Sequence, residues 1–181
     1  MGKLSVSELP ELVRGWIGKA VVVVCDTVTV EKQSWLTFCA AVHDGNALYW
    51  DEAFAQQHTG STIAPPAMLP GWASAPEWYP GKQGDGIRPM ELHFMIKEAL
   101  DYPNGIVTSV DIEYHEPVRA GDSVRVEQIL REVSDERSTR LGPGRNWIID
   151  VVFRRQDGVL LGVQAMAFLG YRSGAVDKEQ S

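Results

Sequence analysis

The expected elements, taken in chain order, predict an α+β fold in one domain. A β-branched strand comes first, short helices follow it, and strand patterns dominate the second half of the chain. Helices and strands do not alternate one by one as they do in βαβ proteins, and no convincing internal repeat is present. A chain of 181 residues is long enough for one sizeable core and too short for two full domains.

The first half of the chain favours one strand and several short helices. Four consecutive valines at residues 21–24 favour a strand over residues 19–28. Apolar residues at helical spacing then indicate a helix that Thr29 is placed to cap. Gly60 is expected to close a later helix, and prolines are tolerated where another one begins. The helices of this half are expected at residues 5–16, 30–42, 50–57 and 63–73.

The second half favours a long loop and about four antiparallel strands. Residues 76–89 are rich in Pro, Gly and aromatic side chains, which indicates a loop that could act as a lid. Apolar and polar residues alternate over residues 106–115, as in a half-exposed strand, and a further strand begins at Val124. Residues 147–153 and 159–169 are both apolar and flank a turn sequence, so they are expected to form a hairpin of central strands.

The domain boundaries follow from this order. The domain itself is expected at residues 19–172, with residues 1–18 as an N-terminal helical extension. Residues 173–181 are polar and are expected to form a disordered tail.

Composition excludes several classes of partner. A formal net charge of -7 argues against general binding to nucleic acid or to an anionic membrane surface. The two cysteines, Cys25 and Cys39, lack the spacing and the further ligands of a metal site, so neither a metal nor a separate cofactor is expected. No secretory signal or transmembrane span is recognisable, and a cytoplasmic location is expected.

Three segments carry the functional signal. They read His-Asp-Gly-Asn-Ala-Leu-Tyr-Trp-Asp at residues 43–51, Ile-Ala-Pro-Pro-Ala-Met-Leu at residues 63–69, and Tyr-His-Glu-Pro-Val-Arg-Ala-Gly-Asp at residues 114–122. Taken alone, the first segment predicts an ordinary helix end, with Gly45 in the left-handed region and Asp44 and Asn46 as turn residues. The third predicts a strand followed by a tight turn.

Together these segments resemble the MaoC-like (R-specific) enoyl-CoA hydratases. The similarity is greatest to the branch named for the dehydratase N-terminal domain of type I fatty acid synthases. The resemblance implies a hot-dog fold, in which a curved antiparallel sheet wraps around one central helix. It also implies pairing with a second hot-dog subunit, edge to edge, in a homodimer, a heterodimer or a heterotetramer.

The resemblance assigns candidate catalytic residues. Asp44 takes the position of the family's catalytic aspartate, and Asn46 that of an asparagine which shapes the same loop. Tyr49 stands where the family has its catalytic histidine, and a phenol with an ordinary pKa of about 10 is a poor general base near neutral pH. Of the four histidines, His43 lies beside Asp44, His93 has an apolar context, and His58 and His115 are expected to face solvent.

The resemblance also assigns candidate substrate-binding residues. Ala67 takes the position of a glycine whose N–H, at the start of the central helix, holds the thioester oxygen. Met68, Trp72 and Trp78 are candidates for the wall of an acyl tunnel. Alternatively, the prolines before Ala67 set only the entry angle of a helix, and the tryptophans belong to the core. The loop arginines Arg137, Arg140 and Arg145 either meet coenzyme A phosphates or are solvated.

Three functions remain open at this point. The first is a hydratase or dehydratase subunit that shapes the acyl pocket beside a partner supplying the Asp/His pair. The second is a self-sufficient homodimeric hydratase that uses Asp44 and Tyr49, and the third is a non-catalytic acyl-CoA binding protein. A thioesterase is ranked last, because a fold alone does not fix a reaction. In each case an acyl thioester, with coenzyme A as part of the substrate, is the expected small-molecule partner.

Overall fold

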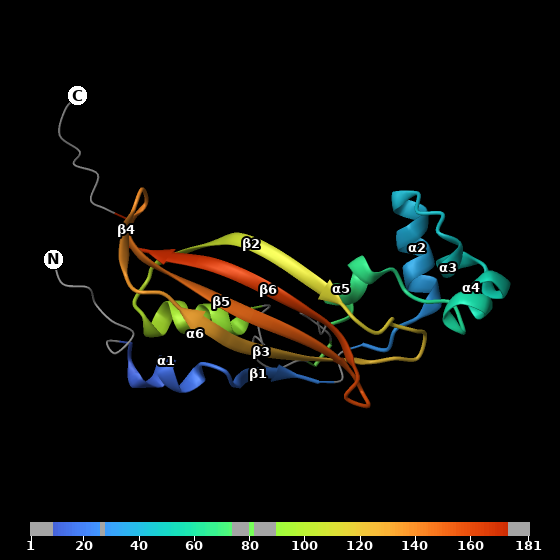
Figure 1. Ribbon diagram of the computed structural model, residues 1–181, viewed down its shortest axis with the longest axis horizontal. Helices are drawn as coiled ribbons and strands as arrows, with labels where there is room; N and C mark the ends of the chain where they lie inside the picture. The colour runs from blue at the N-terminus through green and yellow to red at the C-terminus, as the bar shows by residue number, and fades with distance from the viewer. Residues whose placement is uncertain (1–8, 26–27, 74–79, 82–89, 174–181) are drawn as a thin grey trace, which may run out of the picture.

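A six-stranded antiparallel sheet dominates the structure, a computed structural model that describes residues 9–25, 28–73, 80–81 and 90–173 (Figure 1). The strand order is β1-β3-β5-β6-β2, and β4 pairs with β5. The strands are β1 (Ala20–Val24), β2 (Asn104–Tyr114), β3 (Val124–Val133), β4 (Arg137–Thr139), β5 (Gly142–Arg155) and β6 (Leu160–Tyr171). The helices are α1 (Glu11–Trp16), α2 (Lys32–Val42), α3 (Ala47–Trp50), α4 (Glu52–Thr59), the 3-10 turn η2 (Pro66–Met68), α5 (Leu69–Trp72) and α6 (Glu91–Ala99). The α+β class is confirmed.

The hairpin of β5 and β6 is the centre of the sheet, as the sequence predicted. Its turn places Gly158 at φ 90°, a conformation that favours glycine, and the Gly158 N–H donates to the Arg155 carbonyl. Trp147 faces Phe168 across the pair, and both side chains are buried. On the opposite face of the sheet, Arg131 of β3 forms an ion pair with Asp150 of β5. One face of the sheet therefore carries the core, and the other is polar.

Helix α6 lies along the apolar face of the sheet and is the central helix of the hot-dog arrangement (Figure 1). Leu92, His93 and Ile96 on this helix are buried. The Leu92 N–H at its first turn donates to the buried amide oxygen of Gln128 on β3, at 3.0 Å. Because the first N–H groups of a helix have no intrahelical partner, this contact ties the helix end to the sheet.

The position of this central helix corrects the sequence-based expectation. The helix was expected to begin near Ala67, but Ala67 lies in η2, and only the one-turn helix α5 follows directly. No helix was predicted at residues 91–99, although Leu92, Ile96 and Leu100 are spaced by four residues.

Strand β2 was expected to be half-exposed, with alternate residues buried, and this is wrong. It lies at the edge of the sheet, and nearly all of its residues are exposed. Val107 is 50% exposed and Val110 is 49% exposed, although both lie on the sheet face that carries the core. Among the described residues, α6 covers the start of this strand, where a Cβ at Gly105 would lie 2.9 Å from His93, and it leaves Val107 and Val110 exposed.

Other expected elements are shifted or divided. Leu9 and Val13 bring the N-terminal helix into the core, but its described part is shorter than residues 5–16. The expected helix at residues 50–57 is α4, which Gly60 closes in the left-handed region as predicted, whereas α3 before it was not expected. Thr29 does not cap α2, whose N-cap is Glu31; Thr29 pairs instead with Ser123. The predicted tail and most of the predicted lid lie outside the described residues.

Helices α2, α3 and α4 cluster beyond one end of the sheet, with α5 between them and the strands (Figure 1). We refer to residues 30–64, which contain these three helices, as the helical arm. Within the described part of the chain, no helix is long and apolar enough to cross a membrane.

Candidate functional site

The segment that carries Asp44 begins where α2 ends. The Asp44 N–H donates to the Cys39 carbonyl at 2.8 Å, and the His43 N–H donates to the Ala40 carbonyl at 3.4 Å. This is a Schellman end, in which the left-handed residue is His43, with φ 57°. The expectation that Gly45 takes the left-handed conformation is wrong, because the last turn of the helix places that position two residues earlier. The side chain of Asp44 is held in turn by the Asn46 N–H, at 3.1 Å.

Asn46 acts as the N-cap of α3. Its amide oxygen accepts a hydrogen bond from the Leu48 N–H at 3.1 Å, and Asp51 caps α4 in the same way through the Phe54 N–H. The shape of the loop therefore depends on both side chains.

Tyr49 is buried inside the arm, with 7% of its surface exposed. Burial raises the pKa of its phenol, the negative charge of Asp44 raises this pKa further, and a hydrogen bond with the Asn46 side chain opposes them. The phenol is therefore protonated near neutral pH, when it can donate a hydrogen bond but cannot accept a proton as a base. The three candidate catalytic residues, Asp44, Asn46 and Tyr49, thus lie within one interacting cluster.

The candidate substrate-binding residues lie on the path from the arm to the sheet. Ala67 is exposed in η2, and Met68 is half-buried against the core. Trp72 is buried within the core, in agreement with the alternative interpretation of the aromatic residues. Trp78 lies outside the described residues.

Helix α5 is docked on the sheet through Leu69. A Cβ at Gly162 would lie 2.8 Å from Leu69 Cδ2, closer than side chains tolerate. Gly162 on β6 therefore leaves room for α5. The segment at residues 43–51 contacts the connection between the arm and the sheet through the backbone, where the Ile63 N–H donates to the Leu48 carbonyl at 3.3 Å.

The four histidines lie in different surroundings. His93 stacks on Phe168 with ring centroids 4.2 Å apart, and burial, with a smaller effect of Lys97, lowers its pKa to about 4. His58 stacks on Phe54, and His115 lies 3.6 Å from Glu113. His43 is exposed and serves as the left-handed residue at the end of α2.

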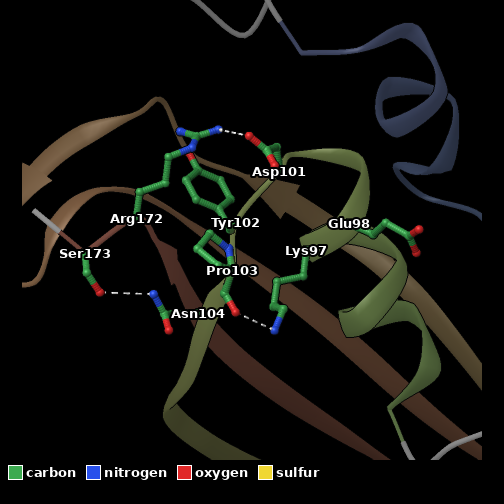
Figure 2. Close-up of a pocket in the computed structure, with 8 residues that line it drawn as sticks. All are labelled: Lys97, Glu98, Asp101, Tyr102, Pro103, Asn104, Arg172 and Ser173. Atoms are coloured by element: carbon green, nitrogen blue, oxygen red, sulfur yellow. Dashed lines mark hydrogen bonds and ion pairs between the residues drawn. The ribbon is translucent and has the colours of Figure 1, made fainter.

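An open pocket of about 510 Å³ lies at the far end of α6, and Figure 2 shows the side chains that line it. Arg172 stands over the Tyr102 ring at 4.6 Å and binds Glu136 at 3.1 Å. Lys97 donates to the Pro103 carbonyl at 3.0 Å. Both cations of the pocket are thus engaged by protein acceptors, which makes this a structural cluster rather than a ready phosphate site.

The arginines of the predicted basic loop differ in their surroundings. Arg145 is buried and donates to the Ser134 carbonyl, whereas Arg137 and Arg140 are exposed. Across the described residues, His, Cys, Asp and Glu side chains do not gather in groups of three that could hold a metal ion.

Comparisons with known proteins identify a family model and relatives that are similar to this chain. The family model described as "FAS1-like, dehydratase domain region" matches residues 16–161. A "Probable enoyl-CoA hydratase alpha subunit" of Thermomonospora curvata is 28% identical over 136 residues, which cover 73% of this chain and 42% of that protein. The matched region therefore spans less than half of that relative's length.

Two solved structures share the fold. A chain of the ChsH1-ChsH2 complex from Mycobacterium tuberculosis is 21% identical, with a TM-score of 0.72 and coverage of 96% of both chains. The MaoC-like dehydratase from Rhodospirillum rubrum is 14% identical, with a TM-score of 0.56, over 83% of this chain and 90% of that one. The family model matches most of the chain, and this chain, with its hot-dog fold, belongs to the family described as the FAS1-like dehydratase domain region.

Proposed function

We propose that this chain is a subunit of an enoyl-CoA hydratase or 3-hydroxyacyl-thioester dehydratase, in which a second hot-dog subunit supplies the catalytic Asp/His pair. The observation that carries this proposal is the buried phenol of Tyr49 at the position of the dyad histidine. Its raised pKa keeps it protonated, so it cannot activate water. Asp44 remains beside it without the basic partner that the family's mechanism requires.

The chemistry defines what the partner must add. Hydration of an α,β-unsaturated thioester needs a base for the water, an acid for the α-carbon, and hydrogen-bond donors for the thioester oxygen. In this proposal the cluster of Asp44, Asn46 and Tyr49 shapes the approach to the acyl group, together with Ala67 and Met68. Coenzyme A enters as part of the substrate, no further cofactor takes part, and the reaction takes place in the cytoplasm.

The exposed edge of the sheet supports a partner subunit. Among the strands that the structure describes, β2 has a neighbour on one side only, and its apolar side chains at Val107, Val110 and Tyr114 are exposed. Such an edge is a ready surface for pairing with another sheet. The structurally similar ChsH1-ChsH2 protein is itself a complex of two named components.

A second candidate is a homodimeric hydratase that uses Asp44 with Tyr49. The electrostatic contact between the two side chains favours it, because an Asp and a hydrogen-bond donor already lie together. This candidate requires turnover without a partner. A non-catalytic acyl-CoA binding protein would bind the thioester and show no turnover under either condition.

The test is the loss of enoyl-thioester absorbance when the purified chain is offered trans-2-enoyl-CoA substrates of several acyl sizes. We expect no turnover by the chain alone, and turnover when a hot-dog subunit with an intact Asp-x-Asn-Pro-x-His motif is added. Turnover by the isolated chain that disappears in Asp44→Asn would favour the homodimeric enzyme. Binding without turnover, both alone and with the added subunit, would favour a non-catalytic acyl-CoA binding protein.

A further inference from the structure

Both ends of the helical arm are tied to one short turn of the sheet, residues 118–122. At the arm's entry, the Val30 N–H donates to the Asp122 carbonyl at 2.8 Å, and the Gly121 N–H donates to the Val30 carbonyl at 2.9 Å. At its exit, the Ala64 N–H donates to the Val118 carbonyl at 2.8 Å. The sequence predicted a strand and a tight turn here, and the structure shows that this turn is also the place where the arm meets the sheet.

Arg119 reaches from this turn into the arm. One end of its guanidinium donates to the Thr59 carbonyl at 2.7 Å, and the other donates to the Ser61 hydroxyl. Its own backbone N–H is held by the buried carboxylate of Asp122, at 2.8 Å. The planar fork of an arginine is suited to such a two-point contact, because both acceptors are reached by one rigid group.

A short chain of contacts connects Arg119 with the candidate site. Thr59 and Ser61 lie at the end of α4, where the Thr59 hydroxyl donates to the Ala55 carbonyl at 3.0 Å. Two residues later the Ile63 N–H binds the carbonyl of Leu48, which precedes Tyr49 in α3. A shift of the chain at residues 59–63 would therefore displace α3 directly.

Among the described elements, the helices of the arm pack mainly against one another, so the clamp at the turn matters for where they lie. The main neighbours of α3 are α2 and α4, whereas α6 contacts β1 and β3. Figure 1 shows the same division, with the arm beyond the end of the sheet. The arm's orientation thus depends on the connections at the turn more than on packing over the sheet face.

We propose that Arg119 is a positioning residue that holds the Asp44–Asn46–Tyr49 cluster in place relative to the sheet. The inference rests on the proposed function only for its catalytic consequence. Its structural part, a two-point clamp between the turn and the end of α4, is testable whether or not the protein is an enzyme.

The first test is amide hydrogen exchange in Arg119→Met. Loss of a charge-assisted contact is expected to accelerate exchange about 10- to 100-fold at Tyr49, Ile63 and Ala64, while β3 and β5 keep their protection. Arg131→Met is the matched control, because Arg131 binds Asp150 within the sheet and does not contact the arm. Unchanged exchange in the arm would overturn the clamp, and so would equal acceleration in arm and sheet.

The conservative variant Arg119→Lys separates the fork from the charge. A single ammonium cannot span the Thr59 carbonyl and the Ser61 hydroxyl as the guanidinium does, so exchange in the arm should be intermediate between wild type and Arg119→Met. Full wild-type protection in Arg119→Lys would overturn the two-point contact.

The second test uses the reconstituted complex with its partner subunit. If the wild-type complex hydrates an enoyl-CoA, Arg119→Met should lower kcat about 10- to 100-fold with little change in KM, because misplacement affects the transition state more than binding. A normal kcat in that variant would overturn the positioning role. Absence of turnover in the wild-type complex would instead count against the proposed function, and the exchange experiment would still decide on the clamp.

Discussion

At the scale of single residues, the environment of His93 couples stability to pH. Its imidazole lies among the rings of Phe94, Trp147 and Phe168, and its Nδ1 is buried with no hydrogen-bond partner among the described residues. Burial, assisted by the positive charge of Lys97, lowers its pKa to about 4 from an ordinary value of 6.5. The unfolded chain therefore takes up the proton first as the pH falls. The stability due to the neutral form is complete above pH 6.5 and is lost as the pH falls toward 4.

The corresponding prediction concerns the free energy of unfolding in denaturant. Between pH 7.5 and pH 5 the wild type should lose roughly 2 kcal/mol through this group, because the folded and unfolded pKa values differ by more than two units. The variant His93→Phe should lose much less over the same range. His115→Gln, which removes a half-exposed histidine, serves as the control and should keep the wild-type slope. An equal loss of unfolding free energy with falling pH in wild type and His93→Phe would contradict the lowered pKa of His93.

At the scale of elements, α6 and α2 illustrate what could be predicted from the sequence. The β5–β6 hairpin was predictable, because an apolar run, a turn with Gly158 and a second apolar run are local signals. Helix α6 was missed, since its first turn is satisfied by Gln128, 36 residues away, and not by a capping residue beside it. The end of α2 at Val42 was predicted correctly, but the left-handed residue after it is His43 and not Gly45.

The contact at the start of α6 gives an element-scale prediction. Gln128→Leu would leave the buried Leu92 N–H without its acceptor, and we expect a loss of about 1–3 kcal/mol in the free energy of unfolding. Gln128→Glu keeps an oxygen acceptor at the same position and should recover part of the loss. The measurement is urea denaturation followed by far-UV circular dichroism. A Gln128→Leu protein as stable as the wild type would show that another group satisfies the helix end.

At the scale of the whole molecule, the candidate site was only partly accessible to sequence reasoning. The clustering of Asp44, Asn46 and Tyr49 followed from their closeness in the chain, and the structure brings them together. The function of Arg119 was not foreseen, because its acceptors lie about 60 residues away and no local pattern marks them. The described surface is also uneven, with apolar side chains exposed on β2 and ion pairs across the opposite face of the sheet.

The exposed apolar side chains on β2 predict that the partner binds at this edge of the sheet. Val110→Lys, at the middle of the exposed edge strand, should weaken association about 10-fold or more, because a charge would be buried at the joined edges. Leu12→Lys is the matched control, since Leu12 is 61% exposed on α1 and away from the edge. Sedimentation velocity of the chain, alone and with its partner subunit, measures the effect. Equal association of both variants would place the interface elsewhere.

In the proposed function, Tyr49 leaves this chain without the base of the reaction. The most direct measurement is kcat for hydration of a trans-2-enoyl-CoA by the chain alone and by its complex with a hot-dog subunit that carries the Asp/His pair. We expect turnover only in the complex, with less than about a threefold change in kcat in Tyr49→Phe, because a protonated phenol is not the base. Turnover by the chain alone that is abolished in Tyr49→Phe would contradict it.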